Sequence, residues 1–102
     1  MIVVWSDSAI DDIQEIHDYY SSTVNLKVAN KIIDKIVEKS IFLENNPRIG
    51  QIEELLEHKQ IEIRYLVEGN YKIVYWIDDN NVIIATVFDC RQDPIKLKNK
   101  NF

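Results

Sequence analysis

Two stretches of the chain repeat apolar residues at the spacing of a helix. In residues 7–20 apolar side chains recur every three or four positions, and the oxygen of Ser6 or Asp7 can cap the start. A second stripe begins after Asn25 and ends before Pro47, because the residue before a proline avoids helical backbone. The short break between the stripes predicts an antiparallel helical hairpin. The stripes comprise Ala9, Ile10, Ile13, Ile16 and Tyr20, and then Val28, Ala29, Ile32, Ile33, Ile36, Val37, Ser40 and Leu43.

After residue 60 the apolar period changes from the helical value to two. Residues 61–67 alternate apolar and polar side chains, and residues 71–77 are almost wholly apolar, which is typical of a central strand. Residues 82–90 form a third apolar run. Polar turn residues separate the three runs, and Gly69 lies in the first turn, where it can adopt positive φ. These features predict an antiparallel meander of three strands.

Residues 2–5 predict one further short strand, and residues 48–60 predict a connector with one helical turn at 53–56. The order β-α-α-β-β-β then predicts an α+β fold, with the helical hairpin packed on one face of an antiparallel sheet. A length of 102 residues predicts a single domain, residues 1–102. The residues predicted to be mostly buried are Ile13, Ile16, Ile32, Ile36, Ile73 and Tyr75.

Composition places the chain among cytoplasmic proteins without a membrane segment. The single cysteine, Cys90, cannot form an intrachain disulfide, which suits a reducing compartment. No apolar run approaches the roughly 18 residues of a membrane span, and residues 1–5 are too short and uncharged for a signal peptide. We therefore expect a cytoplasmic location and no membrane partner.

Charge is distributed unevenly along the chain, whose net charge is −5. Residues 1–90 carry 8 basic and 16 acidic groups, a balance of −8, whereas residues 91–102 carry 4 basic groups and Asp93, a balance of +3. An acidic body repels polyphosphates at long range, so a dedicated nucleic-acid binder is not favoured and a basic protein partner is.

No cofactor or metal site is predicted, because the one cysteine and two histidines lack the spacing of ligands. His58 in the connector could act as a general base, although a solvated loop histidine is the simpler interpretation. The lysines at 27, 31, 35 and 39 recur every four residues, as on a solvated helix face or a docking ridge for an acidic partner.

Three further cations belong to the predicted sheet. Arg64 and Lys72 flank one hairpin, and Arg91 follows the last strand, so all three could approach one end or face of the sheet. Such a cluster would bind an anion and could stabilise charge in phosphoryl chemistry, whereas solvated charges at strand ends remain the alternative.

These residues lie in segments that resemble the RelE/ParE toxin superfamily of type II toxin–antitoxin modules. Residues 64–75 are similar to the family pattern R-x-L-x-x-G-N-Y-x-I-x-Y, and residues 5–20 resemble its first helix. Residues 46–50 resemble its link from helix to sheet, and residues 87–94 its closing strand and exit. The resemblance covers nearly the whole chain in order and implies the same fold as the periodicity.

The resemblance implies a toxin of a plasmid-stabilisation or related module, and it leaves three activities open. ParE-like members inhibit DNA gyrase and arrest growth, RelE-like members cleave mRNA on the ribosome without a metal, and a silent member would only bind its antitoxin and regulate its operon. Lys72 and Arg91 match positions where RelE-like nucleases place arginine, but Leu97 stands where their catalytic tyrosine falls. Phe102 cannot transfer a proton, and residues 61–63 lack the family's lysines. We therefore expect a ParE-like gyrase inhibitor and assign no catalytic residue; Arg64, Lys72 and Arg91 are candidates only for a ribonuclease.

The resemblance also implies partners. A cognate protein antitoxin would wrap the toxin with helices, and operator DNA would be bound only through the toxin–antitoxin complex. DNA gyrase is the expected target, with the ribosome and mRNA as the alternative. Candidate residues for binding a protein partner are Tyr65, Tyr71, Trp76, Lys96 and Lys98.

Overall fold

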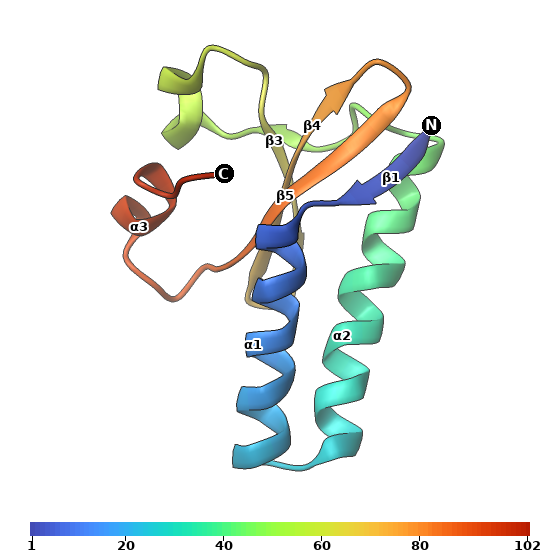
Figure 1. Ribbon diagram of the computed structural model, residues 1–102, viewed down its shortest axis with the longest axis vertical. Helices are drawn as coiled ribbons and strands as arrows, with labels where there is room; N and C mark the ends of the chain where they lie inside the picture. The colour runs from blue at the N-terminus through green and yellow to red at the C-terminus, as the bar shows by residue number, and fades with distance from the viewer.

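The computed structural model describes residues 1–102 and shows a helical hairpin beside a twisted five-stranded sheet (Figure 1). The hairpin pairs α1 (Asp7–Thr23) with α2 (Leu26–Ile41), which ends in the 3₁₀ turn η1 (Phe42–Glu44). The sheet has the order β1-β5-β4-β3-β2. Its strands are β1 (Ile2–Trp5), β2 (Gln51–Ile52), β3 (Arg64–Glu68), β4 (Tyr71–Asp78) and β5 (Asn81–Asp89). The predicted α+β fold and its β-α-α-β-β-β order are confirmed, with β2 as a short addition.

Side-chain caps define where both helices of the hairpin begin. The hydroxyl of Ser6 accepts a hydrogen bond from the N–H of Ala9 at 3.1 Å, so Ser6 rather than Asp7 is the cap. The amide oxygen of Asn25 accepts from the N–H of Val28 at 2.8 Å. Each cap satisfies one of the N–H groups that have no partner within the first turn.

The sheet is mixed, so the prediction of an antiparallel sheet needs correction at β1. Strand β1 runs parallel to β5, with Val3 opposite Val82, whereas all other strand pairs are antiparallel. Parallel neighbours need a long connection between them, and here the rest of the domain separates β1 from β5. The antiparallel order of the meander, in which neighbours along the chain pair with each other, therefore does not extend to β1.

Strand β3 begins later than the alternation of apolar residues predicts. Its first residue is Arg64. Just before it, the carbonyl of Ile63 accepts a hydrogen bond from the N–H of Glu53 at 2.8 Å. This bond ties residues 61–63 to the connector, where Ile61 stays half exposed. The connector contains the 3₁₀ segment η2 (Glu54–Lys59), close to the helical turn that was predicted.

The main core lies between the hairpin and the sheet. Ile36, Ile73 and Tyr75 are fully buried there, as predicted. Ile13 and Ile16 on α1 and Ile32 on α2 pack against the same cluster but are only partly buried, so the prediction that they are mostly buried is corrected. The buried members are Ala9, Ile36, Leu43, Tyr71, Ile73, Tyr75, Val82, Ile84 and Val87.

A second core covers the opposite face of the sheet. It is formed by η2 and by α3 (Pro94–Lys98), a helix that the sequence analysis did not predict. The carboxylate of Asp93 caps α3 by accepting from the N–H of Ile95 at 3.0 Å, and Pro94 occupies its first turn. The buried members are Leu56, Ile63, Val74, Ala85, Phe88 and Leu97. Strand β4 thus contributes to cores on both faces, which explains its nearly continuous apolar sequence.

None of the helices combines the length and the apolar character that crossing a membrane requires.

Candidate functional site

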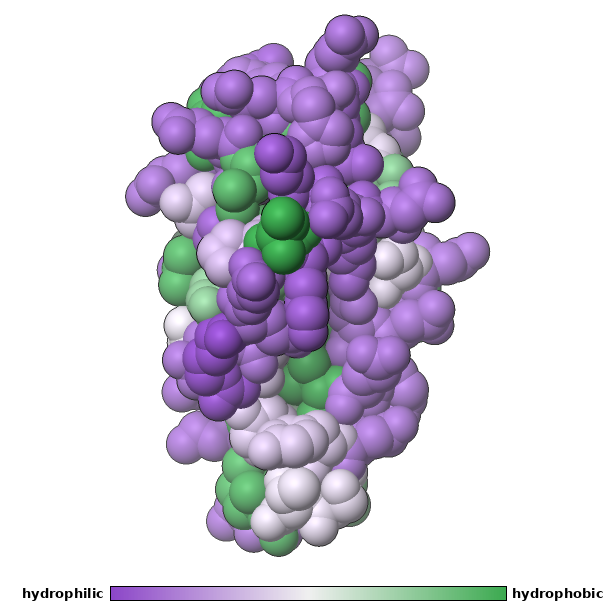
Figure 2. Space-filling view, turned by 90° about the vertical axis from the view of Figure 1, so that its left-hand side faces the viewer, coloured by the Kyte–Doolittle hydropathy of each residue, from purple (hydrophilic) through white to green (hydrophobic).

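An open cleft of about 610 Å³ lies between α1, the end of β5 and the C-terminal segment. Figure 2 shows the side of the molecule where α3 lies, a mostly hydrophilic surface with small apolar patches. The cleft has three acidic and three basic side chains, so its formal charges balance. It is lined by Asp12, Glu15, Ile16, Tyr19, Tyr71, Val87, Phe88, Asp89, Arg91, Gln92, Lys96 and Lys100.

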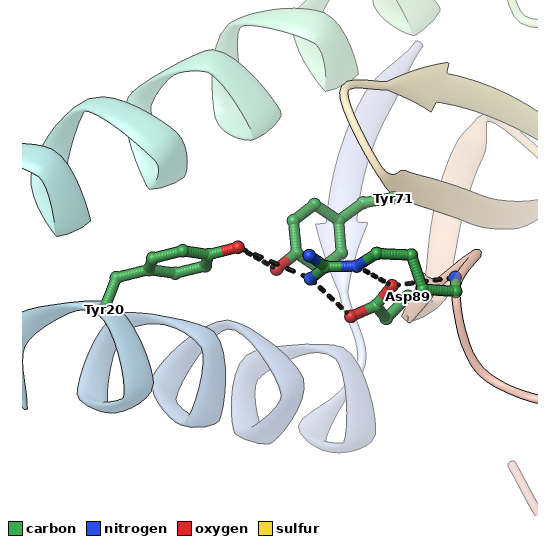
Figure 3. A network of polar contacts seen from close by, with 4 residues as sticks. Tyr20, Tyr71 and Asp89 are labelled. Atoms are coloured by element: carbon green, nitrogen blue, oxygen red, sulfur yellow. Dashed lines mark hydrogen bonds and ion pairs between the residues drawn. The ribbon is translucent and has the colours of Figure 1, made fainter. Parts of the chain in front are cut away.

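Arg91 is the centre of a polar network at one end of this cleft (Figure 3). Its Nε and Nη2 atoms donate to the two carboxylate oxygens of Asp89 at 3.0 and 2.8 Å. Nη2 also lies 3.4 Å from the hydroxyl of Tyr20, which accepts a second contact from the Tyr71 hydroxyl at 3.4 Å. The network therefore joins α1, β4 and the end of β5.

The network changes the protonation equilibria of its members. Hydrogen bonds from Arg91 lower the pKa of Asp89, so its carboxylate is ionised and pairs with the guanidinium. The Tyr71 hydrogen bond, followed by that from Arg91, lowers the pKa of Tyr20. Burial, with the Tyr20 hydrogen bond as a smaller cause, raises the pKa of Tyr71. Tyr20 is thus the phenol of this site that more readily gives up a proton.

Asp12 links three parts of the chain beside the cleft. One carboxylate oxygen accepts hydrogen bonds from the Thr86 hydroxyl and, at 3.0 Å, from the N–H of Val87. The other oxygen pairs with the ammonium of Lys100 at 3.1 Å. Strand β1 pairs with β5 only as far as Ile84, so Asp12 satisfies backbone beyond that point. These partners are more than 70 residues away from Asp12, so no local sequence pattern indicates the contacts.

The three cations of the predicted cluster do not come together. Arg64 is opposite Tyr75 in the β3–β4 register and so shares the hairpin face of the sheet with it, whereas Lys72 lies on the other face. Arg91 follows β5 at the far end, since Asp89 pairs with Tyr71. The hypothesis of one anion site built from all three is wrong, because the side-chain alternation of the strands separates them.

Arg64 and Lys72 have contacts that serve the fold. The Arg64 guanidinium donates to the carbonyl of Gly50 at 2.7 Å and pairs with Glu62 at 2.9 Å. The Lys72 ammonium pairs with the buried carboxylate of Glu53 at 2.6 Å and lies 4.3 Å from the centre of the Tyr65 ring.

The residues predicted to bind a protein partner differ in the solvent exposure of their side chains. Tyr71 faces the main core and is buried, so it cannot serve as an anchor for a partner, and its assignment is corrected. Tyr65 is partly buried, with its hydroxyl bonded to Gln51 at 3.0 Å. Trp76 is partly covered by the stacked ring of Phe102. Lys96 and Lys98 are exposed and form no ion pair.

The remaining polar candidates lie elsewhere. His58 lies with Glu54, Glu57 and Lys98 in a shallow pocket of about 420 Å³. No three His, Cys, Asp or Glu side chains gather as metal ligands would. Leu97 is fully buried in the second core, so its position could not present a side chain to the cleft.

Comparison with known proteins shows the family of this chain. Residues 3–94 match the family model described as the ParE toxin of the type II toxin–antitoxin system parDE. A solved chain from the chromosomal ParDE toxin–antitoxin system of P. aeruginosa has the same fold, with a TM-score of 0.73 and 20% identity. The similarity covers 87% of this chain and 95% of the solved one. No curated protein gives a significant match.

The chain is accordingly a toxin component of a type II toxin–antitoxin system, a class whose members have a cognate protein antitoxin. Within that class it belongs to the ParE toxin family, since the matched residues span nine-tenths of its length.

Proposed function

We propose that the toxin inhibits DNA gyrase and is neutralised by its cognate antitoxin. The observation that carries this proposal is the separation of the candidate catalytic cations. Arg64, Lys72 and Arg91 each pair with a carboxylate of the same chain. A metal-independent ribonuclease needs cations that converge on one phosphate, with an acid–base group beside them. The buried Leu97 cannot supply that group.

One observation favours the ribonuclease alternative. Arg91 lines the open cleft, and its Nη2 lies 3.4 Å from the hydroxyl of Tyr20, whose pKa is lowered by the Tyr71 hydrogen bond first and by Arg91 second. A phenol beside a guanidinium could exchange a proton with a phosphate ester. In that case Arg91 and Tyr20 would be the catalytic pair, in place of the predicted trio of Arg64, Lys72 and Arg91.

Induced expression distinguishes these activities. We expect growth to stop with loss of DNA supercoiling or with DNA damage, while translation of purified mRNA continues, because the chain lacks a convergent catalytic cluster. Plasmid topology on agarose gels and a cell-free translation assay measure the two effects. Cells that carry the empty expression vector are the control for both measurements.

Ribosome-dependent mRNA cleavage would overturn the proposed target. If Arg91 and Tyr20 then act together, Arg91→Ala should lower the cleavage rate about 10²–10³-fold, the usual effect of removing one charge-stabilising donor. Growth without arrest, together with tight antitoxin binding, would identify a silent member that serves only operon regulation.

The antitoxin should associate faster at low salt. Residues 91–102 are basic on an otherwise acidic chain, and exposed Lys96 and Lys98 are free to attract an acidic segment. Charge steering raises the on-rate more than the affinity and is screened by salt. Surface plasmon resonance at 50 and 500 mM salt measures this, and we expect the on-rate to fall about tenfold or more across that range.

The charge-removing variant for this experiment should keep the fold intact. Deletion of residues 96–102 would remove buried Leu97, so Lys96→Gln with Lys98→Gln is the sharper change. A parallel variant, Lys27→Gln with Lys31→Gln, tests the lysines of α2. An on-rate indifferent to salt and to both variants would show that these lysines only solvate the surface.

A further inference from the structure

We propose that residues 94–102 form a strap that closes over the second face of the sheet and builds one wall of the cleft. The strap opens and closes as a unit while the rest of the fold stays intact. This inference is independent of the toxin's target. The match to the family model ends at residue 94, where the strap begins.

Apolar contacts form the first fastening of the strap. Leu97 is fully buried in the second core with Leu56 and Phe88. The ring of Phe102 stacks on Trp76 with centroids 6.2 Å apart and an interplanar angle of 15°. The ammonium of Lys59 lies 4.6 Å from the centre of the Phe102 ring. The strap is therefore attached to both β4 and η2.

An ion pair forms the second fastening. Lys100 reaches across to Asp12 on α1, with 3.1 Å between Nζ and Oδ1. Asp12 is itself held by Thr86 and Val87, so Lys100 meets a carboxylate that is already fixed in place. The Lys100 side chain is 27% exposed, which leaves the ion pair open to screening by salt.

The strap has little order of its own, and this makes its closure all-or-none. Helix α3 has five residues, far fewer than the roughly 12–15 that an isolated helix needs in water. Residues 90–93 join it to β5 and are exposed. If Leu97 leaves the core, nothing in the segment can hold the helix together. Figure 1 shows α3 set apart from the hairpin, joined to β5 by an extended connection.

Opening of the strap changes the cleft as well as the sheet face. Lys96 and Lys100 leave with it, so the basic wall is lost while Asp12 and Glu15 remain on α1. The apolar face around Val74 and Phe88 is uncovered at the same time. When the strap is closed, the cleft beside Arg91 has no net formal charge. When it opens, the cleft becomes an acidic groove next to an exposed apolar surface.

Hydrogen exchange on the full chain tests the proposal. Lys100→Met should speed exchange of the amides of residues 95–100 about two- to fivefold, the effect of losing one partly exposed ion pair. Leu97→Ala should speed it at least about tenfold, because a buried leucine is truncated. The amides of Ile73 and Val74 in β4 should be unchanged by Lys100→Met. Lys98→Met is the control, since Lys98 is two residues before Lys100 but is exposed and forms no ion pair.

Salt and fluorescence provide two further readouts. Salt should speed strap exchange in the wild-type chain but not in Lys100→Met. In a Trp5→Phe background Trp76 is the one remaining tryptophan, and Phe102→Ala should raise its quenching by acrylamide. Exchange in β4 that rises in step with the strap would overturn the proposal, because opening would then be global unfolding. Equal exchange in Lys100→Met and Lys98→Met would equally overturn it.

Discussion

Replacement of Gly50 by alanine is expected to destabilise the fold by about 3 kcal/mol. An added Cβ would lie 2.6 Å from the hydroxyl of Tyr75 and 2.8 Å from the carbonyl oxygen of Tyr65. Overpacking of this kind costs about 1–3 kcal/mol. The hydrogen bond from the N–H of Gly50 to the Tyr75 hydroxyl, 2.9 Å long, would be strained as well, at about 1 kcal/mol. Urea denaturation followed by circular dichroism measures the loss.

Gly69→Ala provides the matched control for Gly50→Ala. Gly69 has φ of +58° and nothing within 4 Å of the added Cβ, so its cost is only that of left-handed backbone, about 1–2 kcal/mol. Tyr75→Phe should recover part of the Gly50→Ala loss, because it removes one of the two clashing oxygens. A Gly50→Ala variant no less stable than Gly69→Ala would contradict this account.

The position of Gly50 also explains two of the patterns on which the family resemblance rests. Residues 46–50 and 64–75 are separate in sequence, but they meet where Arg64 and Tyr75 both bind Gly50. Arg64 bonds its carbonyl oxygen, and Tyr75 accepts from its N–H. The contacts of Arg64 therefore attach the connector to the sheet.

The sequence predicted the helices and strands whose patterns lie within the element itself. Helices α1 and α2 follow from apolar spacing and from the Ser6 and Asn25 caps, and the β3–β5 meander follows from alternation and turns. Strand β1 was expected, but its direction depends on pairing with β5, nearly 80 residues away. Helix α3 was missed because five residues are too few to show a helical period, although Pro94 suits a first helical turn.

The candidate site was predicted in part. Arg91 was singled out, and it lies in the cleft, but its partner Tyr20 was counted only as a member of an apolar stripe. Asp12 lies within residues 5–20, which resemble the family's first helix, but nothing in the spacing indicated that it would bind both β5 and Lys100. A sequence pattern assigns side chains to a face, whereas these contacts depend on how α1 crosses the sheet.

Lys72→Met is the second change expected to have a large effect, about 3 kcal/mol of lost stability. It would leave the Glu53 carboxylate, only 4% exposed, without the ammonium that now lies 2.6 Å away. Removal of one partner of a buried ion pair leaves an uncompensated charge, which typically costs about 3–5 kcal/mol. The estimate is at the lower end because the Lys72 side chain is 21% exposed, so water can reach the site.

A double-mutant cycle in urea separates the charge effect from packing. Glu53→Gln with Lys72→Met removes both charges, and the double variant should be more stable than Lys72→Met alone, because no buried charge remains. Arg91→Met is the control, since the Arg91 side chain is 54% exposed and loss of its pair with Asp89 should move the unfolding midpoint much less. Equal losses in Lys72→Met and in the double variant would show that Lys72 acts only through its contact with the Tyr65 ring. If the coupling energy between Glu53 and Lys72 is close to the stability lost in Lys72→Met, the ion pair itself attaches the connector to the centre of the sheet. It would also assign Lys72, a candidate for phosphate chemistry by sequence, to the stability of the fold.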